Sequence, residues 1–534
     1  MQPIRNNTHS TSSGEKAIQT TPNKWIIAIT VMFGAFMAVM DISVVNVALP
    51  HMMGSFGQDI SAITWIATSY SIAEVIMVTM AGWLSTVLGR KRLYLISFAI
   101  FTIGSIMCGT AQTFTQMLIY RTFQGIGGGA LIPVSQAILR ETFPTEEQGM
   151  AMGIFGMGVV LAPAIGPILG GWLTDSYGWP WIFYINIPVS IAGIFMVWSF
   201  VHDPAYLRRG IRKIDWQGIV LLTITLTTMQ IVLERGQSEN WFESNLIVIG
   251  SVICMIVMLA LIFWEMKTSE PVINFRLLRD IPLTVGSSMG IVFGISLFGT
   301  TFILPQFTQE LLGYSAFDAG LVLAPRAFML VLFMPFAGWL YRRADARLLV
   351  FAGIIFIYWS YYDLAHLSLE AGFWNLAPML LIMGVGMPLM FVTTSTVSLS
   401  SIPHADMTDA SSLYTLSRRI GGNIGYALVA TLVSRETQTH HAYLAGNINP
   451  YNSNYSRFQS ETMSKLLHSG INPSEAKTAV YSLVSLILNR QATMLAYNDV
   501  SRILGFLFLF TIPMVLLLPG RKKVQEQNAA AEGS

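Results

Sequence analysis

Three ionisable residues lie inside long apolar stretches of the chain, and their chemistry sets the first question about function. Asp41, Glu74 and Arg121 each fall within a run of about 20 mostly apolar residues. A charge near the centre of a bilayer costs at least about 2.5 to 3.5 kcal/mol, so such a residue is by default a functional candidate. A carboxylate can exchange a proton as its surroundings change, whereas a guanidinium cannot and must be paired or hydrated. The residue types therefore indicate proton exchange beside a fixed counter-charge.

The depth of each residue in its run refines this interpretation. Asp41 lies about sixteen residues, or roughly 24 Å, into the first run, where it would face a cavity or the next helix. Arg121 lies about six residues, or roughly 9 Å, into the fourth run. A purely structural helix-bridging role is the alternative for both. We interpret Glu74, in the middle of the second run, as a second cavity carboxylate for a cation or a proton, or else as a locally hydrogen-bonded group. Asp363 follows two tyrosines near an outer end, where a solvated interfacial role competes with a cavity role.

Composition identifies the elements that must position these residues. The chain has 534 residues, of which 53% are hydrophobic and only 11% charged, against roughly 25% charged in soluble domains. Mean hydropathy is +0.56. The net charge of +2 argues against a nucleic-acid partner, and the only cysteines, Cys108 and Cys254, lie in apolar runs and predict no metal site or disulfide framework. We therefore expect an all-α polytopic membrane protein.

Apolar runs of spanning length predict fourteen membrane helices, although twelve or thirteen is a possible count. The first six runs are 25–49, 64–84, 93–111, 115–139, 150–177 and 181–201, and two more follow at 216–233 and 244–264. The last six are 282–309, 316–340, 348–367, 375–399, 407–434 and 499–518. The predicted organisation is a tail (1–24), a six-helix bundle (25–201), a linker with two extra helices (202–281), a second six-helix bundle (282–518) and a tail (519–534).

Positive charge orients these helices. With the N-terminus in the cytoplasm, cytoplasmic segments hold 20 Lys and Arg, whereas the short external loops hold one, Arg235. Six more, counting Arg502 at the start of the last span, belong to one long external segment, where the rule does not apply. The remaining four lie inside spans: Arg121, Arg326, Arg418 and Arg419. Both termini are therefore predicted to be cytoplasmic.

Two sequence patterns indicate that the chain has two halves that move relative to each other. The tripeptide at 82–84, Gly-Trp-Leu, recurs at 338–340, each time before a short basic loop, as in the parallel repeats of transporters. In the fifth run, Ala162, Gly166 and Gly170 share one helix face, and Pro163 and Pro167 remove two backbone donors. Such a seam suits rocking of one half against the other, with simple close packing as the alternative.

The external segment 435–498 is polar, unlike its surroundings. Asn472, Pro473 and Glu475 are typical of a helix start, and an apolar stripe follows from Val480 to Ile487. This pattern predicts an amphipathic helix that extends the final span outward and either covers the outer mouth or docks a partner. His440 and His441 are adjacent and would point apart on a helix, so no metal site is expected.

Several segments together resemble the major facilitator superfamily, and specifically its fourteen-helix drug–proton antiporters. The segment 40–50 is similar to the first-helix motif of that group, 82–93 to the loop motif after the second helix, 118–130 to the fourth-helix motif and 163–171 to the antiporter motif of helix five. Segments 181–188 and 304–325 add to the likeness, and the long loop that opens at 435 resembles the EmrB type. One departure is Thr86, where the loop motif usually carries an acid that locks the cytoplasmic gate.

This resemblance implies a proton-driven efflux permease for hydrophobic or cationic drugs in a bacterial inner membrane, working by alternating access without a cofactor. It implies proton coupling by Asp41 and Arg121, with Glu74 as a further candidate, and cavity or substrate roles for Asn46, Gln124 and Asp363. The implied gating residues are Gly82, Gly89, Arg90, Lys91, Pro163, Gly166, Pro167, Gly170 and Gly171. Implied partners are an EmrA-type periplasmic adaptor and a TolC-type outer-membrane channel.

No nucleotide-binding loop or nucleophile–base set appears in the sequence, which favours a gradient-driven transporter over an enzyme. The alternatives are a narrow-substrate exporter or a nutrient symporter.

Overall fold

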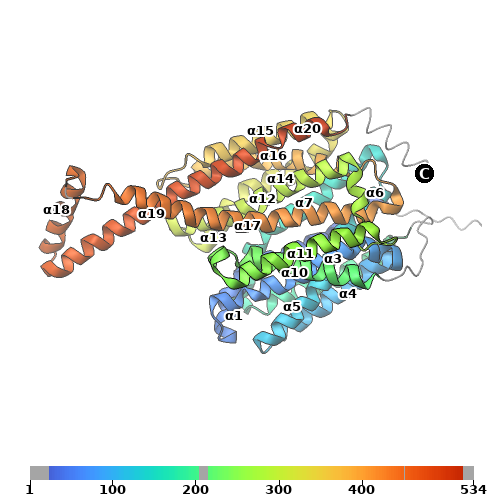
Figure 1. Cartoon of the computed structure of the whole chain (residues 1–534), viewed down its shortest axis with the longest axis horizontal. Coiled ribbons are helices and arrows are strands. Elements are labelled where there is room, and N and C mark those ends of the chain that lie inside the picture. Colours follow the sequence, from blue (N-terminus) through green and yellow to red (C-terminus); the bar gives the residue numbers. More distant parts are fainter. Residues whose placement is uncertain (1–22, 204–214, 450, 521–534) are drawn as a thin grey trace, which may run out of the picture.

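The computed structural model describes residues 23–203, 215–449 and 451–520, and those residues form helices joined by short loops (Figure 1). The first group is α1 (Lys24–Phe56), α2 (Ile60–Ile63), α3 (Trp65–Leu88), α4 (Arg90–Gly109), α5 (Phe114–Gly129), α6 (Leu131–Thr142), α7 (Gln148–Tyr177), α8 (Trp181–Tyr184) and α9 (Asn186–Phe200). Next come α10 (Trp216–Arg235) and α11 (Asn245–Lys267). The second group is α12 (Ile281–Gln306), α13 (Ala316–Val322), α14 (Ala324–Tyr341), α15 (Ala346–Leu364), α16 (Phe373–Ser398), α17 (Met407–Ala445), α18 (Ser453–His468), α19 (Pro473–Leu509) and α20 (Ile512–Leu517). The two predicted tails lie almost wholly outside these residues, as does part of the linker.

The all-helical membrane fold expected from the sequence is confirmed, whereas the count of fourteen spans stays a prediction. Among the described residues, 11 helices are long and apolar enough to cross a membrane, or 12 if the bent helix α7 is one span. The predicted fourth span is divided between α5 and α6, and the thirteenth is α17. Both stretches carry polar side chains in the bundle interior, Arg121 and Gln124 in one and Arg418 and Arg419 in the other. Because of these polar residues and the division of the fourth span, neither stretch is among the 11 helices counted above.

The two helix groups are joined by a pair of equivalent contacts. Helix α3, the second long helix of the first group, packs against α17, and α14, at the matching place in the second group, packs against α7. The repeated tripeptide lies in the last turns of α3 and α14, at these contacts. A Cβ on Gly82 would lie 2.7 Å from Asp409 Cα in α17, and a Cβ on Gly338 would lie 2.7 Å from Met150 Cα in α7. The repeat thus marks two places where only glycine lets the groups meet closely.

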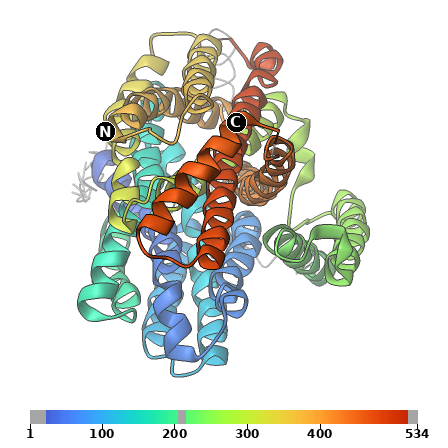
Figure 2. The same cartoon turned by 90° about the vertical axis from the view of Figure 1, so that its left-hand side faces the viewer.

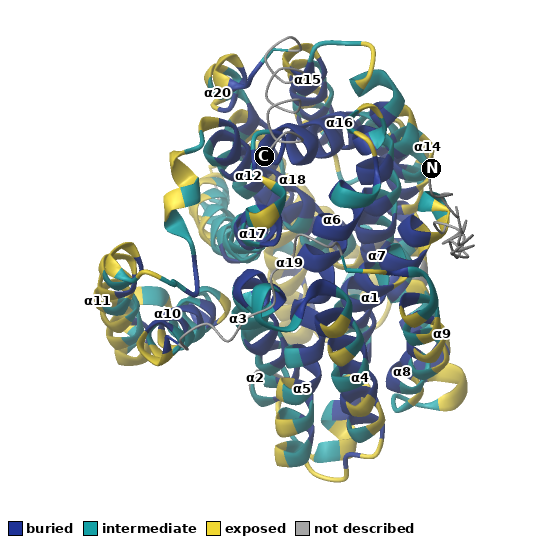
Figure 3. Cartoon of the chain, turned by 90° about the vertical axis from the view of Figure 1, so that its right-hand side faces the viewer, coloured by how far each residue is buried: buried dark blue, intermediate teal, exposed yellow. Residues whose placement is uncertain are grey.

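The two extra helices form a hairpin on the side of the molecule. Helices α10 and α11 pack on each other, and α10 also packs on α3 and α17, one helix from each group (Figure 2). Most of α11 is exposed, with residues such as Ile249, Ile256 and Leu259 more than half exposed (Figure 3). Such an apolar outer surface suits contact with lipid.

The segment predicted to be external forms an extension that projects from one end of the bundle (Figure 1). The predicted amphipathic helix is confirmed: α19 has Asn472 as its N-cap residue, begins at Pro473 and continues without a break into the last span. Helix α18, which the sequence pattern did not predict, packs against its outer part. Of the apolar stripe, Val480 is buried and Val484 half-buried, whereas Leu483 and Ile487 are exposed, as is the neighbouring Leu486.

Candidate functional site

The carboxylate of Asp41 is the centre of a fully buried polar network in the first helix group. Arg121 Nη1 donates to Asp41 Oδ2 over 2.6 Å, and the amides of Gln124 and Asn186 donate to Oδ1 over 2.9 and 2.8 Å. Ser105 Oγ accepts a hydrogen bond from the Gln124 amide over 2.8 Å. Four helices, α1, α4, α5 and α9, therefore supply side chains to one network. All three partners of Asp41 are donors, an arrangement that suits an unprotonated carboxylate.

Arg121 is held in a fixed orientation beside Asp41. Its Nε donates to the Ile66 carbonyl over 3.3 Å, and its guanidinium lies 4.3 Å from the centre of the Tyr70 ring, both in α3. The Tyr70 hydroxyl in turn donates to the Ala38 carbonyl in α1 over 3.4 Å. A planar group with several directed donors fits this setting, whereas a lysine ammonium would lose the pattern. The structure thus brings the two predicted coupling residues together.

Gln124 and Asn186 show where the sequence-based prediction was incomplete. Gln124 was expected among cavity or substrate residues, and the structure places it in the Asp41 network instead. The sequence predicted no role for Asn186, although this residue lies in a segment that resembles a family motif. The signal available in the sequence was an amide directly after an aromatic apolar run, but its partner Asp41 lies 145 positions away along the chain, and spacing could not predict that contact.

Glu74 lies at a small cavity between the two helix groups rather than in the Asp41 network. It forms an ion pair with Arg419 of α17, across the boundary between the groups. The cavity has a volume of about 30 Å³, room for a few waters at most. Its lining is mainly apolar, with Phe293, Phe298 and Phe391 from the second group, and it also contains Arg418. The predicted cavity carboxylate is thus at a cavity, but its charge already has a partner.

A larger cavity of about 880 Å³ lies between the groups toward their outer ends. Helices α1 and α7 line one side with Asn46, Pro167 and Gly171, and the second group lines the other with residues that include Thr301 and Gln309. Asn46 is exposed there, as expected for a cavity candidate. Asp363 lines none of the cavities described here and is half-buried at the outer end of α15.

At the opposite end, which the topology predicts to be cytoplasmic, contacts close the gap between the groups. Arg90 is buried, pairs with Glu141 and donates from Nη2 to the His404 carbonyl of the second group over 2.9 Å. Gly89, between α3 and α4, has a φ of +82°, a conformation that favours glycine. Lys91 Nζ donates to the Trp198 carbonyl over 2.7 Å. Thr86 donates within its own helix, to the Trp83 carbonyl, so Arg90 makes the contact between groups.

The small residues of the fifth run pack α7 against α1. Gly166 faces Ser43, and a Cβ on Gly170 would lie 3.0 Å from the Val44 carbonyl oxygen. Pro163 lines the central cavity, and Pro167 lines the outer one. The bent helix α7 therefore follows the boundary between the groups and contacts both cavities.

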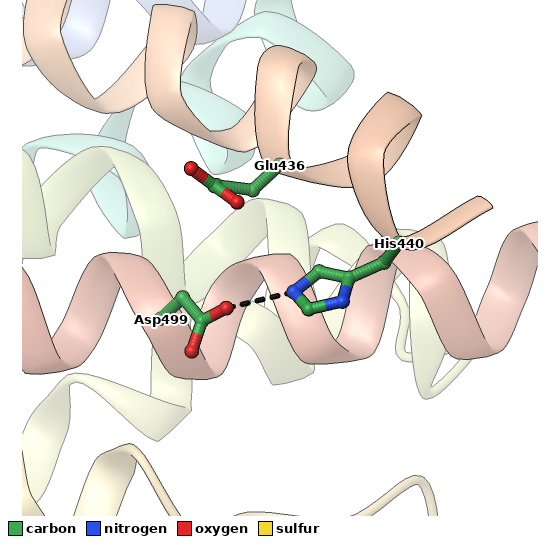
Figure 4. A group of neighbouring side chains, drawn as sticks. All are labelled: Glu436, His440 and Asp499. Atoms are coloured by element: carbon green, nitrogen blue, oxygen red, sulfur yellow. Dashed lines mark hydrogen bonds and ion pairs between the residues drawn. The ribbon is translucent and has the colours of Figure 1, made fainter. Parts of the chain in front are cut away.

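A third polar cluster ties the external extension to the bundle (Figure 4). His440 Nε2 lies 2.7 Å from Asp499 Oδ2, joining α17 to α19, and Arg502 Nη1 lies 3.0 Å from Asp499 Oδ1. With Glu436, His440 and Asp499 form the one group of described residues whose donor atoms, all within 4.8 Å, are spaced for a metal ion. Because Arg502 already neutralises Asp499, we interpret the cluster as a structural contact between α17 and α19, and the absence of a metal site stays a prediction.

A helical membrane bundle of two groups, with one buried ion pair inside a group and another across the boundary between them, is typical of a solute transporter. The family model of the Major Facilitator Superfamily matches residues 31–426, and the chain belongs to that family. It is 33% identical over 454 residues to "Multidrug export protein EmrB" of Escherichia coli (strain K12), covering 83% of this chain and 88% of that protein. It is 29% identical to "Fatty acid resistance protein FarB" of Neisseria gonorrhoeae, covering 92% and 95%. The chain is therefore a transporter of the drug-efflux type and not an enzyme.

Solved structures agree on the fold. The proton:xylose symporter XylE, bound to 6-bromo-6-deoxy-D-glucose, superposes with a TM-score of 0.56 at 13% identity, covering 95% of this chain and 98% of that one. At this identity the likeness concerns the architecture alone. The fold, the family and the multi-pass membrane character predicted from the sequence are thus confirmed.

Proposed function

We propose that this protein exports hydrophobic drugs and other toxic compounds across the bacterial inner membrane in exchange for protons, by alternating access. The observation that carries the proposal is the fully buried pair of Asp41 and Arg121, joined over 2.6 Å inside the first helix group. Burying a charge pair in this position costs free energy of folding, so its presence supports a role in transport. Asp41 is the exchanging carboxylate, and Arg121 is its fixed counter-charge.

The cavities support alternating access. The predicted cytoplasmic end is closed by Arg90 and by the close approach of Gly82 and Gly338 to the other group. The outer cavity lies between the same groups at the other end. This conformation therefore corresponds to a state after substrate release, with Asp41 unprotonated and ready to accept an external proton only when its network opens.

The substrate is hydrophobic in its main body, because the central cavity is lined mostly by aromatic and aliphatic side chains. Multidrug export and fatty acid resistance in the names of its relatives agree with compounds of that kind. The sequence also predicted cationic substrates, with Glu74 as their partner. In this conformation Glu74 is paired with Arg419, so the cavity offers a cation no free carboxylate among the described residues.

The protein acts as the inner-membrane permease of a tripartite system, with an EmrA-type adaptor and a TolC-type outer-membrane channel. The support is the helical extension, which projects from one end of the bundle (Figure 1) and on which Leu483, Leu486 and Ile487 are exposed. Exposed apolar residues on a projecting helix are typical of a protein interface. A narrow-substrate exporter or a nutrient symporter is the alternative, and the direction of transport separates them, since a symporter would accumulate its substrate.

The test is drug-driven proton flux in inverted membrane vesicles that are energised to an acid interior. Wild-type vesicles should lose their pH gradient when an exported compound is added, whereas Asp41→Asn should insert normally and show no response. Glu370→Gln is the matched control, because it neutralises an exposed carboxylate in the loop between α15 and α16. Active efflux retained by Asp41→Asn at equal expression would contradict the assignment of Asp41.

A further inference from the structure

Arg418 is a buried arginine that lines the central cavity and has no partner among the described residues. Its side chain is in α17, the residue is only 6% exposed, and it makes no hydrogen bond or ion pair within that part of the chain. Its Nη1 is sealed from solvent without an acceptor. The nearest compensation is the Phe391 ring, whose centre lies 5.1 Å from the guanidinium carbon. By contrast, Arg121 and Arg419 each pair with a carboxylate.

An unpaired guanidinium at this depth is not explained by packing. Arginine stays charged when buried, and an isolated buried charge is far more costly than one in an ion pair. A cation–π contact with Phe391 offsets only part of that cost. Glycine or alanine at this site would pack without the penalty. The charge is therefore expected to meet a negative group at some stage of the transport cycle.

The surroundings indicate what kind of group that is. Three charged side chains line the cavity, Glu74, Arg418 and Arg419, and the first is paired with the last, so one positive charge remains. The rest of the lining is apolar apart from Thr415, with Phe293, Leu297 and Phe298 in the second helix group. The cavity thus combines an apolar wall with one uncompensated cation.

We propose that Arg418 binds the acidic group of an amphipathic organic anion, such as an aryl carboxylate or sulfonate, while the aromatic wall holds its apolar body. The guanidinium fork matches these planar or tetrahedral oxyanions with two parallel hydrogen bonds. The inference rests on the proposed function, because it takes this cavity as the substrate site. The ligand enters when the helix groups separate, since the cavity now has room for only a few waters.

The test uses three probes that share one apolar body and differ in charge. Naphthalene-2-sulfonate is permanently anionic, 2-naphthyltrimethylammonium is permanently cationic and naphthalene-2-sulfonamide is neutral at pH 7. Their binding to the full-length protein in nanodiscs, without any gradient, is measured by equilibrium dialysis. Wild type should bind the sulfonate at least tenfold more tightly than the ammonium probe. Arg418→Gln should weaken sulfonate binding at least tenfold and leave the sulfonamide almost unchanged, whereas Arg418→Lys should keep part of the preference.

The matched control is Arg326→Gln, which removes another buried arginine that does not line this cavity and that donates to Thr301 Oγ1. It should leave sulfonate binding unchanged, and an equal loss in both variants would overturn the proposal by showing a general charge effect. Equal binding of sulfonate and ammonium probes by wild type, or no binding of any probe, would also overturn it. So would complete displacement of the sulfonate by physiological chloride, which would make the site one for inorganic anions.

The two proposals can fail separately. Proton-driven export of the neutral sulfonamide from vesicles, together with sulfonate binding that ignores Arg418, would leave the efflux function and remove the anion site. Sulfonate binding that depends on Arg418, without any gradient-driven export, would leave the anion site and remove proton-coupled efflux.

Discussion

The carboxylate of Asp41 illustrates how single residues set the chemistry of this protein. Its two oxygens accept three hydrogen bonds from side chains on two other helices, and no cavity described here contains it. Proton exchange therefore requires the network to open, which couples protonation to helix movement. Arg121, Gln124 and Asn186 each determine part of the geometry, but only Arg121 adds charge.

Asn186→Ala tests the neutral part of this network. The change removes a donor that lies 2.8 Å from Asp41 Oδ1 and leaves a buried carboxylate oxygen with less support. We expect a loss of about 1 to 3 kcal/mol of stability, seen as a lower unfolding temperature of the purified protein, together with weaker proton flux. Asn46→Ala is the control for stability, because Asn46 is exposed in the outer cavity. Equal unfolding temperatures for wild type and Asn186→Ala would show that the bond contributes little.

The sequence predicted the coupling residues better than it predicted their partners. Asp41 and Arg121 stand out because a charge in an apolar run is rare, so type and depth alone identify them. The pair of Glu74 and Arg419 could not be predicted, because 345 positions separate the two residues and their contact depends on how the two helix groups meet. Arg418 was counted inside a span, yet its lack of a partner among the described residues is visible only when the cavity lining is known.

At the scale of helices, the contacts between groups depend on glycine at equivalent places. The repeat of Gly-Trp-Leu indicated two related helices, and the structure adds that α3 meets α17 while α14 meets α7. Helical periodicity cannot predict such crossings, because they depend on the relative placement of distant segments. It did predict α19, whose N-cap and proline start are local signals. Local chemistry thus predicted elements, and long-range packing determined the site.

Gly338→Ala should interfere with closure at the predicted cytoplasmic end. The added Cβ would lie 2.7 Å from the Gly149 carbonyl carbon and from Met150 Cα, which are backbone atoms that cannot move aside cheaply. We expect the conformation that is closed at the predicted cytoplasmic end to lose population and export to fall at least tenfold. The measurement is thiol labelling of a cysteine placed at His404, which should become more accessible from the cytoplasmic side.

Gly54→Ala is the control for this experiment, because a Cβ added there would meet no atom within 4 Å and the residue is also in a helix, α1. It should label like wild type. Unchanged labelling and transport in Gly338→Ala would mean that α7 and α14 can separate slightly without changing the balance of states.

At the scale of the whole molecule, the extension belongs to the second helix group. Helix α19 packs against α12, α15, α17 and α18, and Arg490 Nε in its outer half donates to the Leu311 carbonyl over 3.1 Å. His440 of α17 adds a contact with Asp499 at its base. The extension should therefore move together with the second group as one rigid unit. A partner bound to it would follow the transport cycle.

Serine substitution of Leu483, Leu486 and Ile487 together should separate transport from partner docking. These side chains are 38%, 63% and 42% exposed, so their loss removes apolar surface from the extension without creating a cavity in the bundle. We expect the triple variant to transport normally in proteoliposomes, because coupling residues and cavities lie elsewhere. Cells that depend on export through both membranes should become at least as sensitive to the drug as cells lacking the protein.

A triple alanine variant at Thr478, Ser482 and Ser485, on another face of the same helix, should behave like wild type in both assays. If the serine variant also protects cells fully, partner docking does not use these three side chains. A loss of transport in proteoliposomes would instead show that the extension takes part in the transport cycle.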